Sequence, residues 1–216
     1  MLMIRAVFIL AFFVATGFLL PVPASSELYI GGEIGGVFPG KLTNGKGTGT
    51  TSRFTFGDFE MSNSVVYGGK VGYFLESYNW LGFELDAFTA TPHIKQQTVQ
   101  ASPNAIVMQP EAKLRVTTVA LNLVLRYPGE TWQPYVGGGP AFFNAKGTGT
   151  TSDSDNGIGF NFIAGLRVFI IQHLAVFGEY KYFGATFKFD NAFGPGAGIE
   201  EDYKASHIVA GVSYHF

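Results

Sequence analysis

Apolar and polar residues alternate along eight separate segments of this 216-residue chain. In the stretch VALNLVLRYP, Leu121, Leu123 and Leu125 share one face, whereas Asn122 and Arg126 lie on the other. Period two is the period of a β-strand, whose successive side chains point to opposite faces. The segments cover approximately residues 28–38, 65–75, 81–87, 113–128, 135–143, 160–168, 174–182 and 208–216. The chain is therefore predicted to be all-β.

The composition of the two faces favours a membrane barrel. One face is bulky and aromatic, in a chain with 22 Phe, 10 Tyr and only 14% charged residues, while the other carries one or two charges per segment and much of the 29 Gly. A soluble β-sandwich, the alternative, would carry more charge on its solvated face. Segments of about ten residues cross a bilayer when tilted. We therefore predict an eight-stranded antiparallel up-and-down transmembrane β-barrel.

The first residues have the pattern of a secretory signal. Arg5 precedes an uncharged apolar run, and PVPASS then offers small residues for cleavage. We expect residues 1–24 to be a signal peptide, cleaved after Ala24 or, alternatively, after Ser26, and residues 25–216 to form the barrel domain. A retained membrane anchor is the other interpretation. The absence of cysteine excludes disulfides and thiol catalysis, and a net charge of −2 gives no basic surface for nucleic acid.

The connections between the segments alternate in length. Short ones are predicted at residues 76–79, 128–131 and 171–173, and long ones at 39–64, 91–113, 145–157 and 185–204. In outer-membrane barrels the short turns face the periplasm and the long loops face outward. Trp80 and Trp132 follow short turns, where an aromatic girdle would meet the inner interface of the membrane.

The last ten residues, HIVAGVSYHF, end on an aromatic residue, with Tyr214 two places earlier on the same face. Together with the signal peptide and the eight segments, this ending resembles small outer-membrane β-barrels of the OmpA/OmpX-like class. The resemblance implies a porin-like envelope protein in the outer membrane of a Gram-negative bacterium. It also implies that Tyr214 and Phe216 form an assembly signal for the barrel assembly machinery. Unlike full-length OmpA, the chain ends at the barrel, so no peptidoglycan-binding domain is expected. We expect a monomer in contact with outer-membrane lipids and lipopolysaccharide.

Charged residues on the inward faces balance one another. The acidic residues are Glu33, Glu84, Asp86 and Glu179, and the basic residues are Lys70, Arg126, Arg167 and Lys181. Eight strands leave an interior that side chains fill, and buried charges are costly unless they are paired. We therefore predict that a salt-bridge network plugs the lumen of a barrel with a structural or surface-interaction role. A narrow pore for small solutes is the alternative.

Candidate chemistry is sparse, and we expect no enzymatic activity, no cofactor and no metal centre. The stretch TPHIKQQ is similar to a segment of barrels known as lipid A oxidases, which makes lipid A modification (of the oxidase or acyl-chain-modifying type) the enzymatic alternative. Its candidate residues at the outer rim are His93, Lys95, Gln96 and His207. A deacylase pattern, His-x-Ser, fails at His207.

Acidic residues of the outer connections could hold a cation loosely. The stretch DSDNG lacks the spacing of an EF-hand. A loose surface cation site at Asp153 and Asp155, or at the run 200–202, is a further alternative to plain solvated charge.

The heptapeptide KGTGTTS occurs twice, at residues 46–52 and 146–152. A phosphate-binding loop would end in Gly-Lys-Ser/Thr before a helix, which neither copy does. Both copies are predicted to lie in exposed outward loops. Each preceding strand carries Tyr-x-Gly-Gly, at residues 29–32 and 135–138. Duplication of a four-stranded half would explain the repeat, as would convergent loop composition.

Overall fold

A computed structural model of the chain describes residues 27–39, 43–58, 60–95, 97–102, 105–109, 112–148, 153–190 and 195–216. The predicted signal peptide lies outside these residues. They contain no helix that is long and apolar enough to span a membrane. The strands are β1 (Glu27–Pro39), β2 (Thr43–Gly49), β3 (Thr55–Phe56), β4 (Ser64–Phe74), β5 (Leu81–Ala90), β6 (His93–Ile94), β7 (Gln97–Ser102), β8 (Ala105–Gln109), β9 (Ala112–Arg126), β10 (Trp132–Thr148), β11 (Asp153–Ile171), β12 (Leu174–Phe189) and β13 (Ala197–His215).

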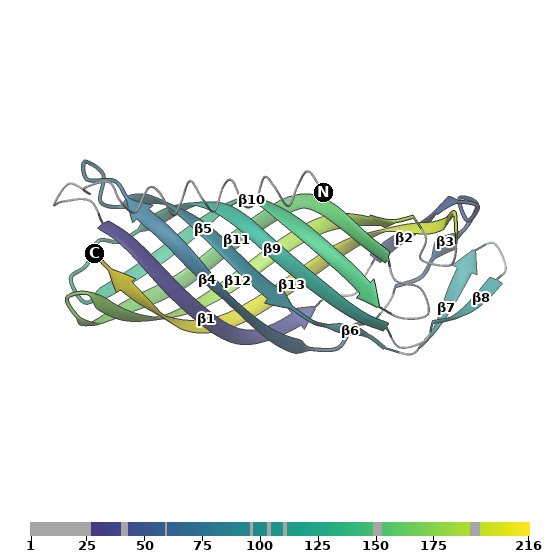
Figure 1. The fold of residues 1–216 in the computed structure, drawn as a ribbon, viewed down its shortest axis with the longest axis horizontal. Helices are drawn as coiled ribbons and strands as arrows, with labels where there is room; N and C mark the ends of the chain where they lie inside the picture. Colours follow the sequence, from purple (N-terminus) through teal and green to yellow (C-terminus); the bar gives the residue numbers. More distant parts are fainter. Residues whose placement is uncertain are drawn as a thin grey trace.

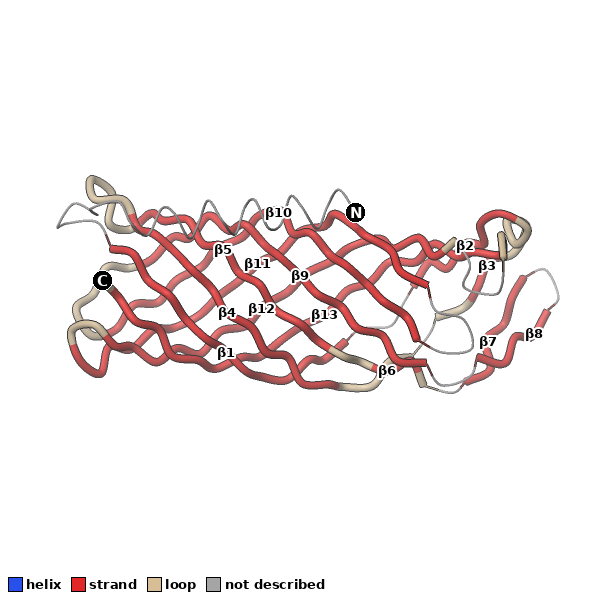
Figure 2. Tube along the Cα trace, viewed as in Figure 1, coloured by secondary structure: helices blue, strands red, loops and turns tan. Residues whose placement is uncertain are grey.

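Eight of these strands close into a ring. They follow one another in the order β1-β4-β5-β9-β10-β11-β12-β13, each antiparallel to the next. The ring closes because β13 pairs back onto β1, from Tyr29 opposite His215 to Pro39 opposite Ala205. Figures 1 and 2 show the tilted strands of the resulting barrel, which is extended at one end by β2, β3, β7 and β8. The predicted fold is confirmed.

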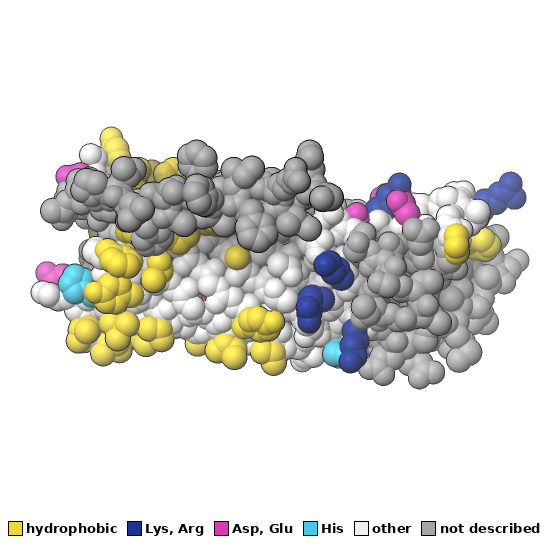
Figure 3. All heavy atoms as spheres, viewed as in Figure 1, with side chains coloured by type: hydrophobic (Ala, Val, Ile, Leu, Met, Phe, Trp, Pro, Cys, Tyr) yellow, Lys and Arg dark blue, Asp and Glu magenta, His cyan; other side chains and the backbone are white. Residues whose placement is uncertain are grey.

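The outward face carries an apolar band. Ile34 is 63% exposed and Phe160 is 50% exposed, as suits side chains that meet lipid instead of water. Trp80 and Trp132, beside short turns, are also exposed. In Figure 3, apolar side chains gather on the half of the barrel that holds the C-terminus, and Lys and Arg side chains gather near the outer ends of β9 and β10.

The strands extend farther outward than the sequence predicted. Strand β10 continues to Thr148, β12 to Phe189, and β13 begins at Ala197, so most of the connections predicted at 145–157 and 185–204 is strand. The reason is a change of face. Above the band the apolar residues, such as Phe187 and Tyr203, point inward and are buried. Side chains still alternate between the two faces, but the apolar residues now occupy the inward positions instead of the outward ones.

The first copy of KGTGTTS also differs from its prediction as a loop. Residues 46–49 belong to β2, which pairs with the outer end of β13, with Lys46 opposite Glu200. A turn follows, with Gly49 in the left-handed region at a φ of 64°. The second copy begins in β10, and residues 149–152 of it lie outside the described part of the chain.

The interior is layered. A lower aromatic layer contains Tyr29, Phe74 and Tyr135. Charged residues follow above it, and a larger apolar cluster fills the outer half. That cluster consists of Val37, Phe56, Met61, Val66, Phe88, Ala90, Leu114, Val116, Ala120, Ala141, Phe143, Ala145, Phe183, Ala185, Phe187, Ile199, Tyr203, Ala205 and Val209. The rings of Phe88, Phe143 and Phe183 pack in a row, with centroids 5.7 Å apart at each contact.

Candidate functional site: the lumen charge network

Alternation along the strands places all the predicted interior charges inside the barrel. We call these eight residues the lumen charge network: Glu33, Lys70, Glu84, Asp86, Arg126, Arg167, Glu179 and Lys181. Each is buried, with at most 8% of its surface exposed. Two lysines and four carboxylates form its centre, while the two arginines lie apart from it.

Lys70, on β4, reaches carboxylates on three other strands. Its Nζ atom lies 2.9 Å from both oxygens of Glu179 on β12. It also lies 3.4 Å from Glu84 on β5 and 3.4 Å from Glu33 on β1. The four strands are thereby tied together across the lumen.

Lys181, on β12, makes a second set of contacts. Its ammonium hydrogen-bonds to Glu33 and lies 2.5 Å from Asp86 and 3.4 Å from Glu179. Among the described residues, Glu33, Asp86 and Glu179 are the one group of potential metal ligands in which one oxygen of each residue lies within 4.8 Å of the others. The ammonium of Lys181 contacts all three, so the cluster holds a cation of its own.

The arginines have other partners. Arg126 pairs with Glu27 at 2.6 Å, donates a hydrogen bond to the carbonyl of Asn79 and stacks on Phe74. It therefore anchors the short-turn end of the barrel. The guanidinium carbon of Arg167 lies 4.3 Å from the centre of the Tyr29 ring and 5.4 Å from that of Tyr135. The sequence predicted one salt-bridge network of four acidic and four basic residues and did not separate the arginines from it.

Two tyrosines that the sequence did not assign to the network complete its lower edge. Tyr29, on β1, donates a 2.6 Å hydrogen bond to Glu84, which lies two strands away on β5. Tyr135, on β10, donates a 2.7 Å hydrogen bond to Glu179, two strands away on β12. The Tyr-x-Gly-Gly pattern was the available signal for them.

Each of the two tyrosines lies in a row of three residues across neighbouring strands, with a glycine between the tyrosine and its glutamate. Gly72 lies opposite Tyr29 on one side and Glu84 on the other. Gly165 lies in the same way between Tyr135 and Glu179. Each glycine leaves room for the ring, because a Cβ at Gly72 would lie 2.3 Å from Tyr29 and one at Gly165 would lie 2.5 Å from Tyr135. Because β1 and β10 are four strands apart in the ring, the repeated row has the symmetry that duplication of a four-stranded half would leave.

The rim candidates are not brought together. His93 and Lys95 lie at and beside β6, and Lys95 pairs with Glu60 at 3.5 Å. His207 lies inside the barrel instead of at the rim, fully buried between the rings of Phe88 and Phe183. Strands β6 and β13 are on different sides of the ring. Gln96 lies outside the described residues.

The two loose cation sites predicted from the sequence lie in different surroundings. The side chain of Asp153 is outside the described part, and Asp155 accepts a 2.7 Å hydrogen bond from the backbone N–H of Lys188. The run 200–202 lines a pocket at the outer end of the barrel.

The predicted assembly residues lie at the short-turn end of the barrel. Phe216 donates its backbone N–H to the carbonyl of Leu28, and the ring of Tyr214 contacts that of Phe216.

The architecture agrees with the sequence comparison. The profile of the outer membrane protein beta-barrel domain family matches residues 10–216. The chain belongs to this family. A comparison with curated protein sequences found no match.

Solved structures of outer-membrane barrels share the fold of this family member. The outer membrane protein OprG from Pseudomonas aeruginosa superposes with a TM-score of 0.61 at 14% identity, covering 89% of this chain and 96% of OprG. Neisserial surface protein A gives a TM-score of 0.56 at 14% identity, covering 88% and 97%. The outer membrane protein AlkL, solved by solid-state NMR in lipid bilayers, gives 0.52 at 16%, covering 91% and 93%.

Proposed function

We propose that this protein is a structural and surface-interacting barrel of the outer membrane, whose lumen the charge network keeps closed to solutes. The observation that carries the proposal is the contact of one ammonium, that of Lys70, with carboxylates from three other strands. Its side chain is 1% exposed, and those of Glu33, Glu84 and Glu179 are 0% exposed. A solute would have to part these buried pairs, which costs several kcal/mol for each ion left unpaired.

The packed outer half of the interior supports the same conclusion. A conducting path would also cross the aromatic row of Phe88, Phe143 and Phe183, all of which are buried. These rings pack against one another and against the buried side chain of His207, so a solute would have to displace them in order to pass.

Planar-bilayer recording tests the closed lumen. The wild-type protein should give no conductance steps across a wide voltage range. Stable steps from pure, monomeric wild-type protein would overturn the proposal and favour the narrow pore.

Mass spectrometry tests the enzymatic alternative. Lipid A mass spectra from cells with and without the protein should be identical, and a new lipid A species would establish the enzymatic alternative.

For the surface role, we propose that phosphates of lipopolysaccharide are the partner of the cationic side chains above the apolar band. Arg115 on β9 and Lys146 on β10 lie directly opposite each other and both point outward. Like charges in this position destabilise a sheet, and a phosphate between them removes the repulsion. Within the described residues, no carboxylate forms a salt bridge with either side chain. Phe142, on the same face of β10, marks the adjacent lipid-facing surface.

A lipid A titration tests this partner. Phosphorylated lipid A should raise the unfolding temperature of the wild type and have a smaller effect on the double variant Arg115→Ser/Lys146→Ser. Dephosphorylated lipid A provides the control for the acyl chains. Equal stabilisation of both proteins by phosphorylated lipid A would contradict the assignment.

A further inference from the structure

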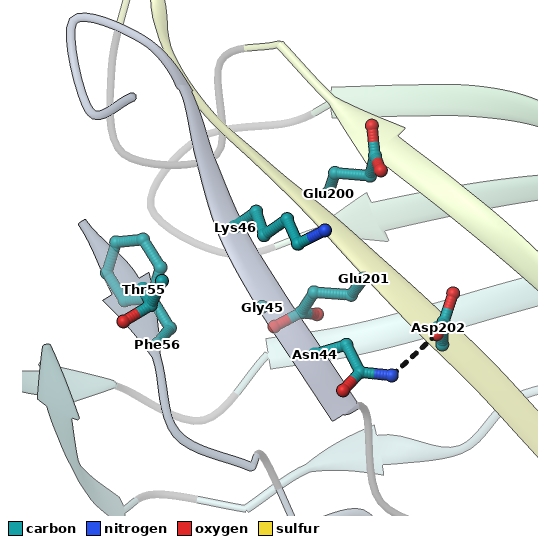
Figure 4. Close-up of a pocket in the computed structure, with 8 residues that line it drawn as sticks. All are labelled: Asn44, Gly45, Lys46, Thr55, Phe56, Glu200, Glu201 and Asp202. Carbon is teal, nitrogen blue, oxygen red and sulfur yellow. Dashed lines mark hydrogen bonds between the residues drawn. The ribbon is translucent and has the colours of Figure 1, made fainter. Parts of the chain in front are cut away.

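A pocket lies at the outer end of the barrel, where β2 pairs with β13. Its volume is about 390 Å³, a size suited to a small organic molecule. It is lined by Asn44, Gly45, Lys46, Thr55, Phe56, Glu200, Glu201 and Asp202. We call it the mouth pocket, and Figure 4 shows its side chains from β2, β3 and β13.

An irregularity in strand pairing forms the mouth pocket. Glu200 pairs with Lys46 and Asp202 with Thr43, so that Asn44 and Gly45 together face the single residue Glu201. The extra residue is a β-bulge, which bends a strand and redirects its side chains. Asn44 has a φ of 59°, in the left-handed region that asparagine tolerates better than most residues. Bulges are frequent at barrel rims and beside binding sites.

Glu201 is the unusual residue of this pocket. It is only 4% exposed, yet its Oε1 atom has no hydrogen-bond partner among the described residues. A Cβ at Gly45 would lie 3.0 Å from the Cβ of Phe56 and 3.3 Å from that oxygen, so a side chain at this position would crowd the carboxylate. Burial without a partner raises the pKa of Glu201 to about 8. A buried carboxylate without a partner is costly, and a ligand that donates hydrogen bonds to it would remove that cost.

The remaining charges of the pocket show what kind of ligand fits. Glu201 points to the inward face of β13, whereas Glu200 and Asp202 lie on its outward face together with Lys46 of β2, so no ammonium of these lining residues compensates Glu201. Asp202 already accepts hydrogen bonds of 2.8 Å from Asn44 and Thr186, which leaves Glu201 as the unmet acceptor. Once Glu201 is ionised, an anion would be repelled here, and a neutral sugar would leave the negative charge of this carboxylate uncompensated.

A bare metal ion fits less well than a larger cation. Within the described residues, Glu200, Glu201 and Asp202 do not bring one carboxylate oxygen each within 4.8 Å of the others, as a metal site would require. Phe56 of β3 is buried on the same inward side as Glu201 and adds an apolar wall to the pocket (Figure 4). We propose that the mouth pocket binds a small organic cation, whose ammonium or guanidinium group donates hydrogen bonds to the Glu201 carboxylate.

Calorimetric titration of the folded barrel in detergent micelles tests this site, with agmatine as the probe. At pH 8.5, where Glu201 is ionised, the wild type should bind one agmatine saturably. Glu201→Gln keeps the shape but loses the charge, and should weaken binding about tenfold or more. Asp190→Asn removes an exposed carboxylate outside the pocket and should change the affinity less than about twofold.

A second variant separates loss of the site from loss of the fold. Gly45→Ala places a methyl group beside Phe56 and the Glu201 carboxylate and should also weaken agmatine binding. Heat-modifiable migration on a detergent gel must show that every variant is folded. The inference is overturned if the wild type binds no agmatine, if folded Glu201→Gln binds it as tightly as the wild type, or if Ca²⁺ binds the site more tightly than agmatine. Because conductance plays no part in this test, its failure leaves the proposed closed lumen unaffected.

Discussion

The Nζ atom of Lys70 lies 2.9 Å from both carboxylate oxygens of Glu179, although the two residues are 109 positions apart in the sequence. The contact crosses the lumen from β4 to β12, between which β1 and β13 intervene in the ring. Its strength depends on both partners, because either charge alone would be buried without compensation.

Removing one partner should therefore be costly. We expect Glu179→Gln or Lys70→Met to lower the free energy of unfolding by about 3–5 kcal/mol, measured by urea unfolding in lipid vesicles. Lys188→Met is the matched control, since Lys188 pairs with Asp190 at 3.6 Å on the exposed surface and should change stability by less than about 1 kcal/mol. Equal effects at the two sites would show that the lumen network does not stabilise the barrel.

Gly72 should tolerate no side chain. The methyl group of Gly72→Ala would meet the Tyr29 ring, so the ring must move and its hydrogen bond to Glu84 must lengthen or break. We expect a loss of about 1–3 kcal/mol in urea unfolding. Gly178→Ala is the control because nothing lies within 4 Å of its added Cβ. A neutral Gly72→Ala would refute the close approach of glycine and tyrosine.

Glu201 should make stability depend on pH. Burial raises its pKa from 4.5 to about 8, so the folded state retains a proton that the unfolded state releases. Stability is therefore expected to fall as pH rises from about 4.5 to about 8, by on the order of 5 kcal/mol. Glu201→Gln should remove this part of the pH dependence. Unfolding curves of the two proteins at pH 5 and pH 9 give the comparison, and parallel profiles would contradict it.

The C-terminal residues are expected to act in assembly more than in stability. Phe216→Ser removes the terminal ring but retains the backbone hydrogen bond to Leu28. We expect a clear fall in the amount of barrel in the outer membrane, measured by heat-modifiable migration of cell envelopes. Refolding of the purified variant into detergent should remain near the wild-type yield. A refolding defect as large as the defect in cells would point to stability instead of recognition.

Much of this fold could be predicted because lipid-facing side chains alternate visibly with small and charged ones. The residues of the lumen charge network could be placed inside for the same reason. The longer strands could not, because on β13 the apolar phase changes from inward at Tyr203 to outward at Ile208. When a strand is expected to keep its apolar residues on one face, this change looks like the end of the strand. The bulge opposite Glu201 depends on pairing between distant segments, which a local pattern does not contain.

The pairing of β1 with β13 has a consequence for how the molecule is made. These two strands are the first and last of the ring, so the seam joins segments synthesised at opposite ends of the barrel domain. Before the last strand arrives, β1 presents an open row of backbone donors and acceptors, which hydrocarbon cannot satisfy. The order of synthesis thus requires that the sheet be sheltered until its final strand docks. Among the junctions of the described ring, the seam forms only once all eight strands are present.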